Sequence, residues 1–119
     1  MTKKSERAMI VIYNSIIPFK GFRCINLFGI LFARKGMTIF KHTVVHESIH
    51  TAQMKEMLYV FFYLWYFVEW LVKLCYFRDS KVAYHYISFE CEAFRHQHDD
   101  DYLPRRKHFT WLKYIIKRA

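Results

Sequence analysis

His46-Glu47-Ser48-Ile49-His50 is the stretch around which the rest of the chain can be interpreted. It is an HExxH motif: two histidines lie four residues apart, with a glutamate directly after the first. On a helix, residues four apart lie on one face, about one turn along the axis. Two imidazoles placed in this way can bind one Zn²⁺, and Glu47 then lies beside the metal, where it can take a proton from a bound water. The motif predicts a zinc hydrolase, most often a peptidase, with Glu47 as general base.

The alternative interpretation of this motif is a solvated helix start that carries two surface histidines. Two local features argue against it. The motif lies in an apolar-rich segment, and Gln53 lies three residues after His50, on the same face of the expected helix as the two histidines.

The composition indicates one packed domain that covers residues 1–119. The chain is 54% hydrophobic and 20% aromatic, and it has only 3 Gly and 2 Pro, which leaves little room for disorder. The formal net charge of +9 is compatible with binding to nucleic acid or to an anionic membrane surface. Because the basic residues are scattered and no nucleic-acid module signature is present, we expect no nucleic acid partner.

The cysteines and the N-terminus bear on the compartment. Cys24, Cys75 and Cys91 are far apart and form no CxxC pair, so a reduced intracellular compartment fits best. The first seven residues are polar and charged, and the apolar run after them is too short for a secretory signal. We therefore expect a cytoplasmic or membrane-associated protein.

Three apolar runs before the motif predict a small N-terminal antiparallel sheet. They are residues 8–13, residues 22–34 with their best part at 26–34, and residues 37–40. Gly29 inside the second run indicates a bulge or a close approach of another backbone.

Three further segments have helical patterns. They are residues 44–57, with Thr43 as N-cap, residues 81–98, and a basic amphipathic stretch at 108–117. The expected fold class is therefore α+β, with the small sheet packed on three or four helices and the HExxH motif on the first long helix.

The most apolar part of the chain is residues 57–77, which continue directly from the motif segment. Residues 58–68 carry no charge, and Glu69 and Lys73 after them are spaced so that they can pair on a helix. Three alternatives remain open: a buried core helix, a helix that lies on a membrane surface or a partner protein, and a helix that spans a membrane.

A catalytic zinc site needs a third protein ligand, and residues 89–94 are the best place for it. Glu90 and Glu92 lie two positions apart on one expected helix, so their side chains point about 200° apart and only one can face the metal. Cys91 between them is interpreted as a core thiol. His96 and His98, beside the acidic run 99–101, are interpreted as a polar helix end.

HExxH followed by a helix with E-x-x-A resembles the gluzincin metallopeptidases. Within that group the chain is most similar to the integral-membrane CAAX-prenyl and heat-shock endopeptidases and to the small soluble minigluzincins. The resemblance covers about residues 43–94. It implies a zincin-like fold, Zn²⁺ held by His46, His50 and Glu90, Ala93 as a small residue where two helices meet, and a peptide or protein substrate.

The resemblance also implies features around the ligands. The family has an aspartate one position after the alanine, and Phe94 stands there in this chain. Glu92 is the candidate to support the site in its place. The family holds substrate backbone by strand addition, for which Leu27 to Arg34 is the candidate.

Two questions stay open at the level of sequence. Tyr102, Arg105 and His108 are candidates for a group that stabilises an oxyanion. The rival to a peptidase is a non-catalytic metal-binding module that docks on a membrane surface or a partner protein through the aromatic segment.

Overall fold

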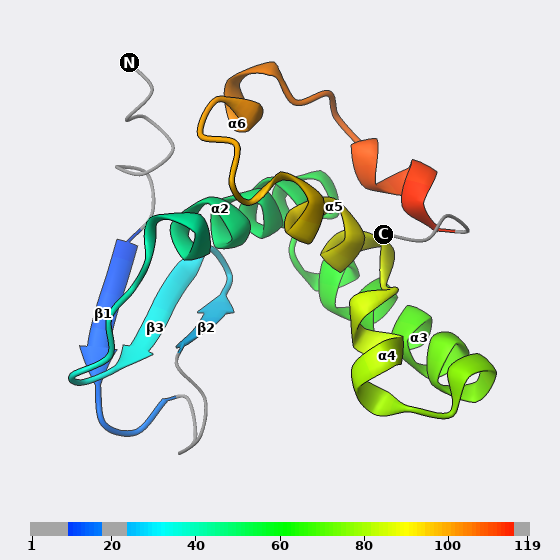
Figure 1. The fold of residues 1–119 in the computed structure, drawn as a ribbon, viewed down its shortest axis with the longest axis horizontal. Coiled ribbons are helices and arrows are strands. Elements are labelled where there is room, and N and C mark those ends of the chain that lie inside the picture. Colours follow the sequence, from blue (N-terminus) through cyan, green and yellow to red (C-terminus); the bar gives the residue numbers. More distant parts are fainter. Residues whose placement is uncertain (1–9, 18–23, 116–119) are drawn as a thin grey trace.

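The computed structural model describes residues 10–17 and 24–115, and its fold class is α+β, as expected (Figure 1). The sheet has three strands: β1 (Ile10–Asn14), β2 (Cys24–Leu27) and β3 (Ile30–Arg34). Their order is β1-β3-β2, with β3 parallel to β1 and antiparallel to β2. The prediction of an antiparallel sheet is wrong. β2 runs opposite to β3, but β1 runs in the same direction as β3 and pairs with it, so the sheet is mixed.

The long apolar run at 22–34 forms two strands instead of one. Phe28 and Gly29 turn the chain between β2 and β3, with φ angles of 54° and 90°. Two consecutive residues of positive φ make the tight hairpin turn whose twist suits paired strands. Gly29 lies in this turn, and its close neighbour is a side chain and not the predicted backbone: a Cβ there would lie 3.3 Å from the side chain of Thr51. Residues 37–40 form no strand, and residues 8 and 9 lie outside the described part of the chain.

The motif helix, α2 (Lys41–Glu56), begins earlier than predicted. Its N-cap is Phe40, which makes no side-chain capping bond, and Thr43 lies inside the first turn. The helix is held to the edge strand of the sheet by Asn26, whose Nδ2 donates to the carbonyl oxygen of Glu47 (2.9 Å) and to Thr51 Oγ1 (3.2 Å). These bonds fix the motif relative to β2.

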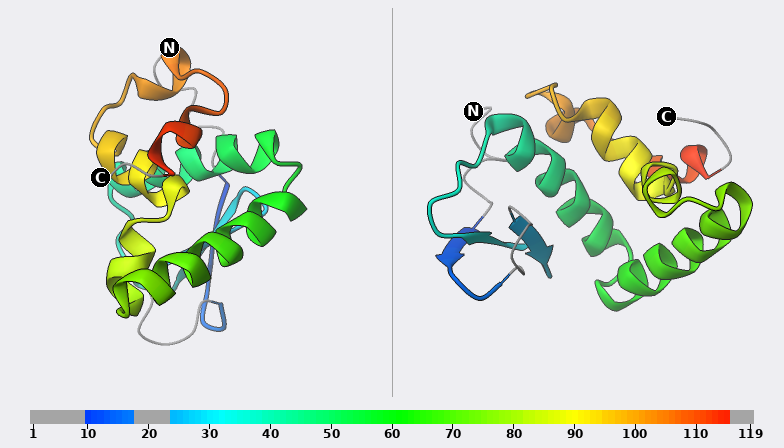
Figure 2. Two further views of the ribbon diagram at one scale, coloured as in Figure 1. Left: turned by 90° about the vertical axis from the view of Figure 1, so that its right-hand side faces the viewer. Right: turned by 60° about the horizontal axis from the view of Figure 1, so that its bottom comes forward.

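The motif helix does not run on into the apolar segment. Leu58 and Tyr59 both have positive φ, and a separate helix, α3 (Val60–Phe77), begins after them. Both views in Figure 2 show α3 along the outside of the molecule. Because only Phe62 and Glu69 are buried among its residues, the buried-core interpretation of 57–77 is wrong.

The helix predicted at 81–98 is interrupted and forms α4 (Ser80–His85) and α5 (Ser88–His96). The interruption follows from the expected pair Glu69–Lys73, whose atoms Oε2 and Nζ lie 3.3 Å apart. Glu69 accepts hydrogen bonds from the N–H (2.8 Å) and hydroxyl (2.6 Å) of Ser88, and Lys73 donates to the carbonyl oxygen of Tyr86 (2.5 Å). The pair thus holds α3 against the start of α5.

The C-terminal part closes the fold over α5. It contains the short helix α6 (Tyr102–Arg105) and a 3₁₀ helix, η1 (Thr110–Tyr114), where a longer helix was predicted at 108–117. The last two residues of that prediction lie outside the described part. The main apolar cluster joins α2, α3, α5 and η1 through Met54, Phe62, Ile87, Phe89 and Trp111.

Candidate metal centre

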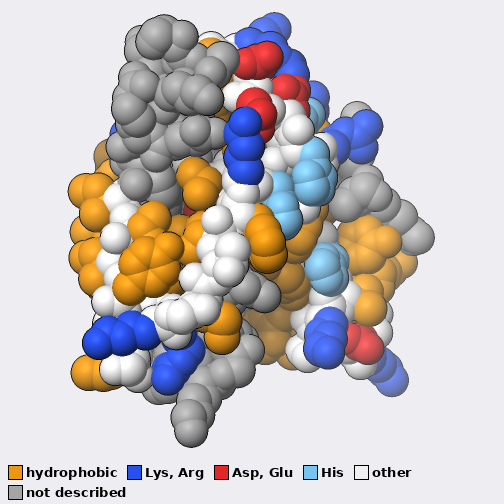
Figure 3. Space-filling model, turned by 60° about the vertical axis from the view of Figure 1, so that its left-hand side comes forward, with side chains coloured by type: hydrophobic (Ala, Val, Ile, Leu, Met, Phe, Trp, Pro, Cys, Tyr) orange, Lys and Arg blue, Asp and Glu red, His pale blue; other side chains and the backbone are white. Residues whose placement is uncertain are grey.

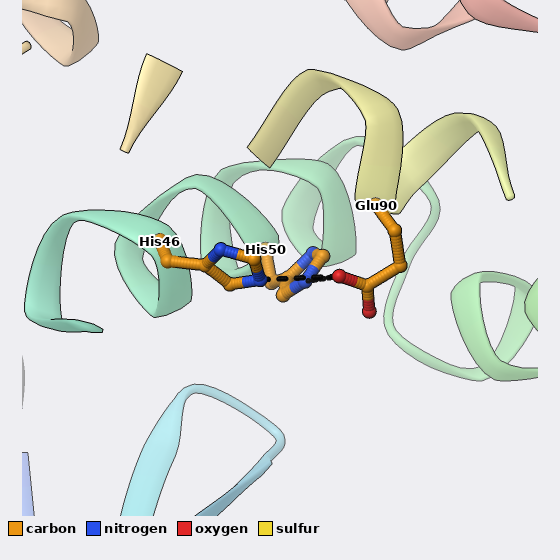
Figure 4. Close-up of side chains that lie close together, drawn as sticks. All are labelled: His46, His50 and Glu90. Atoms are coloured by element: carbon orange, nitrogen blue, oxygen red, sulfur yellow. Dashed lines mark hydrogen bonds and ion pairs between the residues drawn. The ribbon is translucent and has the colours of Figure 1, made fainter. Parts of the chain in front are cut away.

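The motif histidines and one downstream carboxylate converge in the interior. His46 and His50 extend from α2, Glu90 extends from α5, and the three side chains point at one another (Figure 4). All three are buried, and one ligand atom from each lies within 4.8 Å of the others. This group could therefore hold one metal ion.

The tautomer of His50 follows from its contact with Gln53. The amide nitrogen of Gln53 donates to Phe89 O (3.1 Å) and to Glu92 Oε1 (2.9 Å), two groups that can only accept. The amide oxygen therefore faces His50 Nδ1, 2.7 Å away, and accepts a hydrogen bond from its N–H. In the neutral ring, Nε2 of His50 then directs its lone pair at the centre of the group.

Nε2 of His50 is buried and lies 3.2 Å from Glu90 Oε1, and while the ring is neutral neither atom has a proton to donate to the other. An imidazole lone pair and a carboxylate oxygen repel each other unless positive charge lies between them. A cation bound by both atoms would supply that charge, and so would a proton. The donor set thus fits a metal ion on the chemistry of its own atoms.

His46 is oriented in the same way by a different glutamine. Its Nδ1 lies 2.8 Å from the amide oxygen of Gln97, the C-cap residue of α5, and its Nε2 lies 3.1 Å from Glu90 Oε1. Each motif histidine therefore has an amide oxygen behind it. Such outer contacts fix ligand tautomer and ring orientation in metal sites.

The electrostatics of the group favour a bound positive charge. Burial acts to lower the pKa of His50, but the contacts with Glu90, together with Glu47 and Gln53, outweigh burial and raise this pKa to about 9. Burial acts to raise the pKa of Glu90, but His50 and His46 hold it well below its usual range. Glu90 is therefore an ionised carboxylate, as a metal ligand must be.

Two tyrosines that the sequence did not indicate complete the surroundings of Glu90. The hydroxyl of Tyr66, on α3, donates to Glu90 Oε2 (2.5 Å), and Tyr84, on α4, lies close by in the same cavity. Burial, followed by the charge of Glu90, raises the pKa of both phenols, so both remain protonated donors. Tyr66 lies in a uniformly aromatic run, where no spacing distinguishes it.

A cavity of about 290 Å³ opens beside the group. Strand β2 forms one wall, and the other walls include Glu47, Tyr63, Tyr66 and Tyr84. Glu47 therefore lies next to the candidate metal ligands without belonging to them, as the motif predicts.

Glu92 points away from the three ligands, as the two-residue spacing from Glu90 requires. It accepts hydrogen bonds from Tyr102 Oη (2.5 Å) and Arg106 Nε (2.5 Å). Through the amide of Gln53 it still reaches His50, so it supports the group indirectly. Phe94, which stands at the position of the family's aspartate, packs its ring on His46, with centroids 4.6 Å apart.

The three residues named as oxyanion-stabilising candidates lie away from the cavity. Tyr102 is bonded to Glu92, Arg105 pairs with Asp99, and His108 lies on Glu56. None of them lines the cavity. His96 and His98 also lie outside the metal group found in the described residues, in agreement with their interpretation as a helix end.

No protein-family model, curated protein or solved structure matches this chain significantly. What the site does is therefore inferred from its own chemistry.

Proposed function

We propose that this protein is a zinc-dependent, gluzincin-like peptidase in which His46, His50 and Glu90 bind Zn²⁺ and Glu47 is the general base. One observation carries the proposal. Both histidines present Nε2 to the same carboxylate oxygen because a glutamine oxygen holds each Nδ1.

Zinc suits this donor set better than other common ions. Two imidazole nitrogens and one carboxylate oxygen form a ligand set typical of catalytic zinc, whereas magnesium and calcium prefer oxygen alone. Within the described residues the group contains three ligands, which leaves a position for water. Zinc held by these residues would lower the pKa of that water to about 7.

The side chains of the cavity supply the remaining chemistry. Glu47 borders the same cavity as His50 and Glu90, where it can accept a proton from the attacking water and return it to the leaving amine. Tyr66 holds the second oxygen of Glu90 and so orients this ligand. Tyr84, which stays protonated and borders the same cavity, is the candidate donor to a developing oxyanion once it turns from Glu90.

The wall formed by β2 favours a peptide as substrate. The strand predicted for this role, residues 27–34, is mostly β3, which is paired on both sides and cannot take another strand. β2 is the edge strand at the cavity. Tyr63 now covers its outer edge, accepting from Phe28 N (2.9 Å) and donating to Asn26 O (3.3 Å). An extended peptide that replaces this hydroxyl would find a donor and an acceptor in strand spacing.

The test combines metal analysis with cleavage of a mixed peptide library, read by mass spectrometry. We expect one zinc per chain, little zinc in His46→Ala, and full zinc but no cleavage in Glu47→Gln. Asp101→Asn removes an exposed carboxylate remote from the cavity and should leave both readouts unchanged.

Three results would count against the proposal in different ways. Absence of zinc from wild type, with His46→Ala unchanged in metal content and fold, would exclude the metal site. Cleavage by Glu47→Gln at the wild-type rate would exclude the general base. A zinc with four protein ligands and no cleavage would favour the non-catalytic module.

A further inference from the structure

Helix α3 presents an uninterrupted apolar surface to solvent. We define its outer face as Phe61, Leu64, Val68, Leu71 and Val72, whose exposed fractions lie between 40% and 60%. With Ile115 of the C-terminal part, four of these residues border a groove of about 550 Å³. By contrast, hydrophobic side chains on the face shown in Figure 3 are interspersed with Lys, Arg and His.

Both charges of α3 are committed to bonds within the protein. Glu69 accepts from Trp65 Nε1 (3.1 Å) as well as from Ser88, and Lys73 is bonded to Glu69 and to Tyr86 O. They border the groove, but none of their bonds depends on an outside partner. The outer face itself thus offers apolar contact alone.

Cations flank the outer face at both of its ends. Lys55 lies in the last turn of α2, Arg78 is the C-cap of α3, and Lys81 lies in α4; all three are exposed. Two acids adjoin these cations in the chain. Glu56 is buried against Arg106, and the carboxylate of Asp79 caps α4 by accepting from Lys81 N (2.9 Å) and Val82 N (3.1 Å). The rim is therefore basic around an apolar centre.

We propose that α3 docks in the plane of an anionic lipid surface, with its outer face among the acyl chains and the three flanking cations at the headgroups. An apolar helix face bordered by Lys and Arg is the arrangement that binds an anionic interface. This docking does not depend on the metal site being catalytic.

The basic rim decides between lipid and a second copy of the chain. In a symmetric pair of α3 helices, each end of the helix meets a cationic end of its partner whichever way the helices run. Like charges then face each other, whereas an anionic surface complements every one of them. The three stretches outside the described residues, 1–9, 18–23 and 116–119, are rich in Lys and Arg, so in composition they do not match an apolar face.

The position of α4 favours docking in the plane over spanning. α3 has the length and hydropathy of a membrane span, since its 18 residues average 1.4. However, α4 packs against α3, and Trp70 Nε1 donates to Ser80 O (3.4 Å). A spanning α3 would carry the far end of α4, with the exposed His85, into the hydrocarbon, which is costly for a polar side chain.

The experiment is flotation with liposomes, using the full-length protein. The liposomes contain either phosphatidylcholine alone or phosphatidylcholine with 30% phosphatidylglycerol. We expect binding to the anionic liposomes that weakens with added salt, together with a blue shift of the tryptophan emission. The double variant Leu64→Glu/Val68→Glu should bind at least about tenfold more weakly, because two half-exposed apolar side chains are lost from the contact.

Matched variants separate the apolar and electrostatic parts. Lys55→Glu/Arg78→Glu should lose the preference for anionic lipid, whereas Lys35→Glu, in the turn after β3, and Ile16→Glu, which is exposed near β1, should bind like wild type. The proposal is overturned if wild type does not bind liposomes. It is equally overturned if wild type is a dimer that Leu64→Glu/Val68→Glu dissociates while lipid binding stays unchanged.

Discussion

Two regions depart from the usual distribution of side chains. The interface between α2 and α5 buries polar groups, and the outer face of α3 exposes apolar ones. Between α2 and α5, polar groups such as Gln53 and Glu92 have no exposed surface at all, and each is hydrogen-bonded. On α3, large apolar side chains face solvent without a covering partner in the described chain. Buried polar groups and large exposed apolar patches are the informative exceptions to ordinary burial. The comparison teaches that this chain has two surfaces made for something other than its own core.

The largest effect is expected from breaking the charges buried behind the metal group. Arg106 bonds both Glu56 (2.7 Å) and Glu92 (2.5 Å), and all three side chains are almost fully buried. Arg106→Ala leaves two carboxylates without their cation and should lower the free energy of unfolding by about 3–5 kcal/mol, measured by urea denaturation. Arg105→Ala removes an exposed neighbour that pairs with Asp99 and should cost less than about 1 kcal/mol. Equal losses for both arginines would contradict the importance of the buried network.

Two adjacent residues of α3 test its two faces. Phe62 is 3% exposed and contacts Phe89, whereas Phe61 is 54% exposed on the outer face. Phe62→Ala should cost about 3–4 kcal/mol of unfolding free energy, since it opens a cavity in the core. Phe61→Ala should change it by no more than about 0.5 kcal/mol. If Phe61→Ala destabilised the lipid-free protein as strongly, its side chain would be part of the fold and not of a docking surface.

A smaller effect is expected for the glutamine behind His50. Gln53→Met keeps the volume but removes the acceptor for Nδ1, so zinc affinity should fall roughly 10–100-fold in competition with a chromophoric chelator. Gln97→Met removes the equivalent acceptor of His46, but Gln97 is partly exposed and water can replace it, so the loss should be smaller. Unchanged affinity in folded Gln53→Met would show that the amide does not position the ligand.

The smallest effect is expected on the loss of stability at low pH, to which Glu56 contributes. Burial acts to raise the pKa of Glu56, but hydrogen bonds from Arg106 and from Phe109 N outweigh it and lower this pKa from 4.5. A folded pKa below the unfolded value means that Glu56 stabilises the fold above the unfolded pKa, and that this contribution is lost as pH falls through the folded pKa. Glu56→Gln should therefore flatten the decline of unfolding free energy below about pH 4.5. An identical decline in both proteins would contradict this assignment.

Local periodicity was sufficient for the residues of the site that lie on α2 and α5. The four-residue spacing of His46 and His50 and the opposite directions of Glu90 and Glu92 follow from helix geometry alone. Gln53, three residues after His50, lies on the ligand face for the same reason. These predictions succeed because one helix fixes all the relative directions.

Contacts between distant segments could not be predicted in this way. Gln97, Tyr66 and Arg106 reach the site through tertiary packing, and no spacing in the sequence relates them to the motif. The helix break at Leu58 and Tyr59 has no glycine or proline to signal it. Both residues have positive φ because packing of α3 overrides their local preference for negative φ. Parallel pairing of β1 with β3 is likewise a property of the assembled sheet.

The span of chain between His46 and Glu90 bears on how the protein assembles. These residues are 44 apart in sequence, and both α3 and α4 lie between them. An ion shared by the two side chains would act as a tether that closes a long loop and removes much of the freedom of the unfolded chain, as a disulfide does. The metal would then bind late in folding, after α5 has packed against α2. Removal of the metal by a chelator would weaken the packing of α5 on α2 before it unfolded either helix.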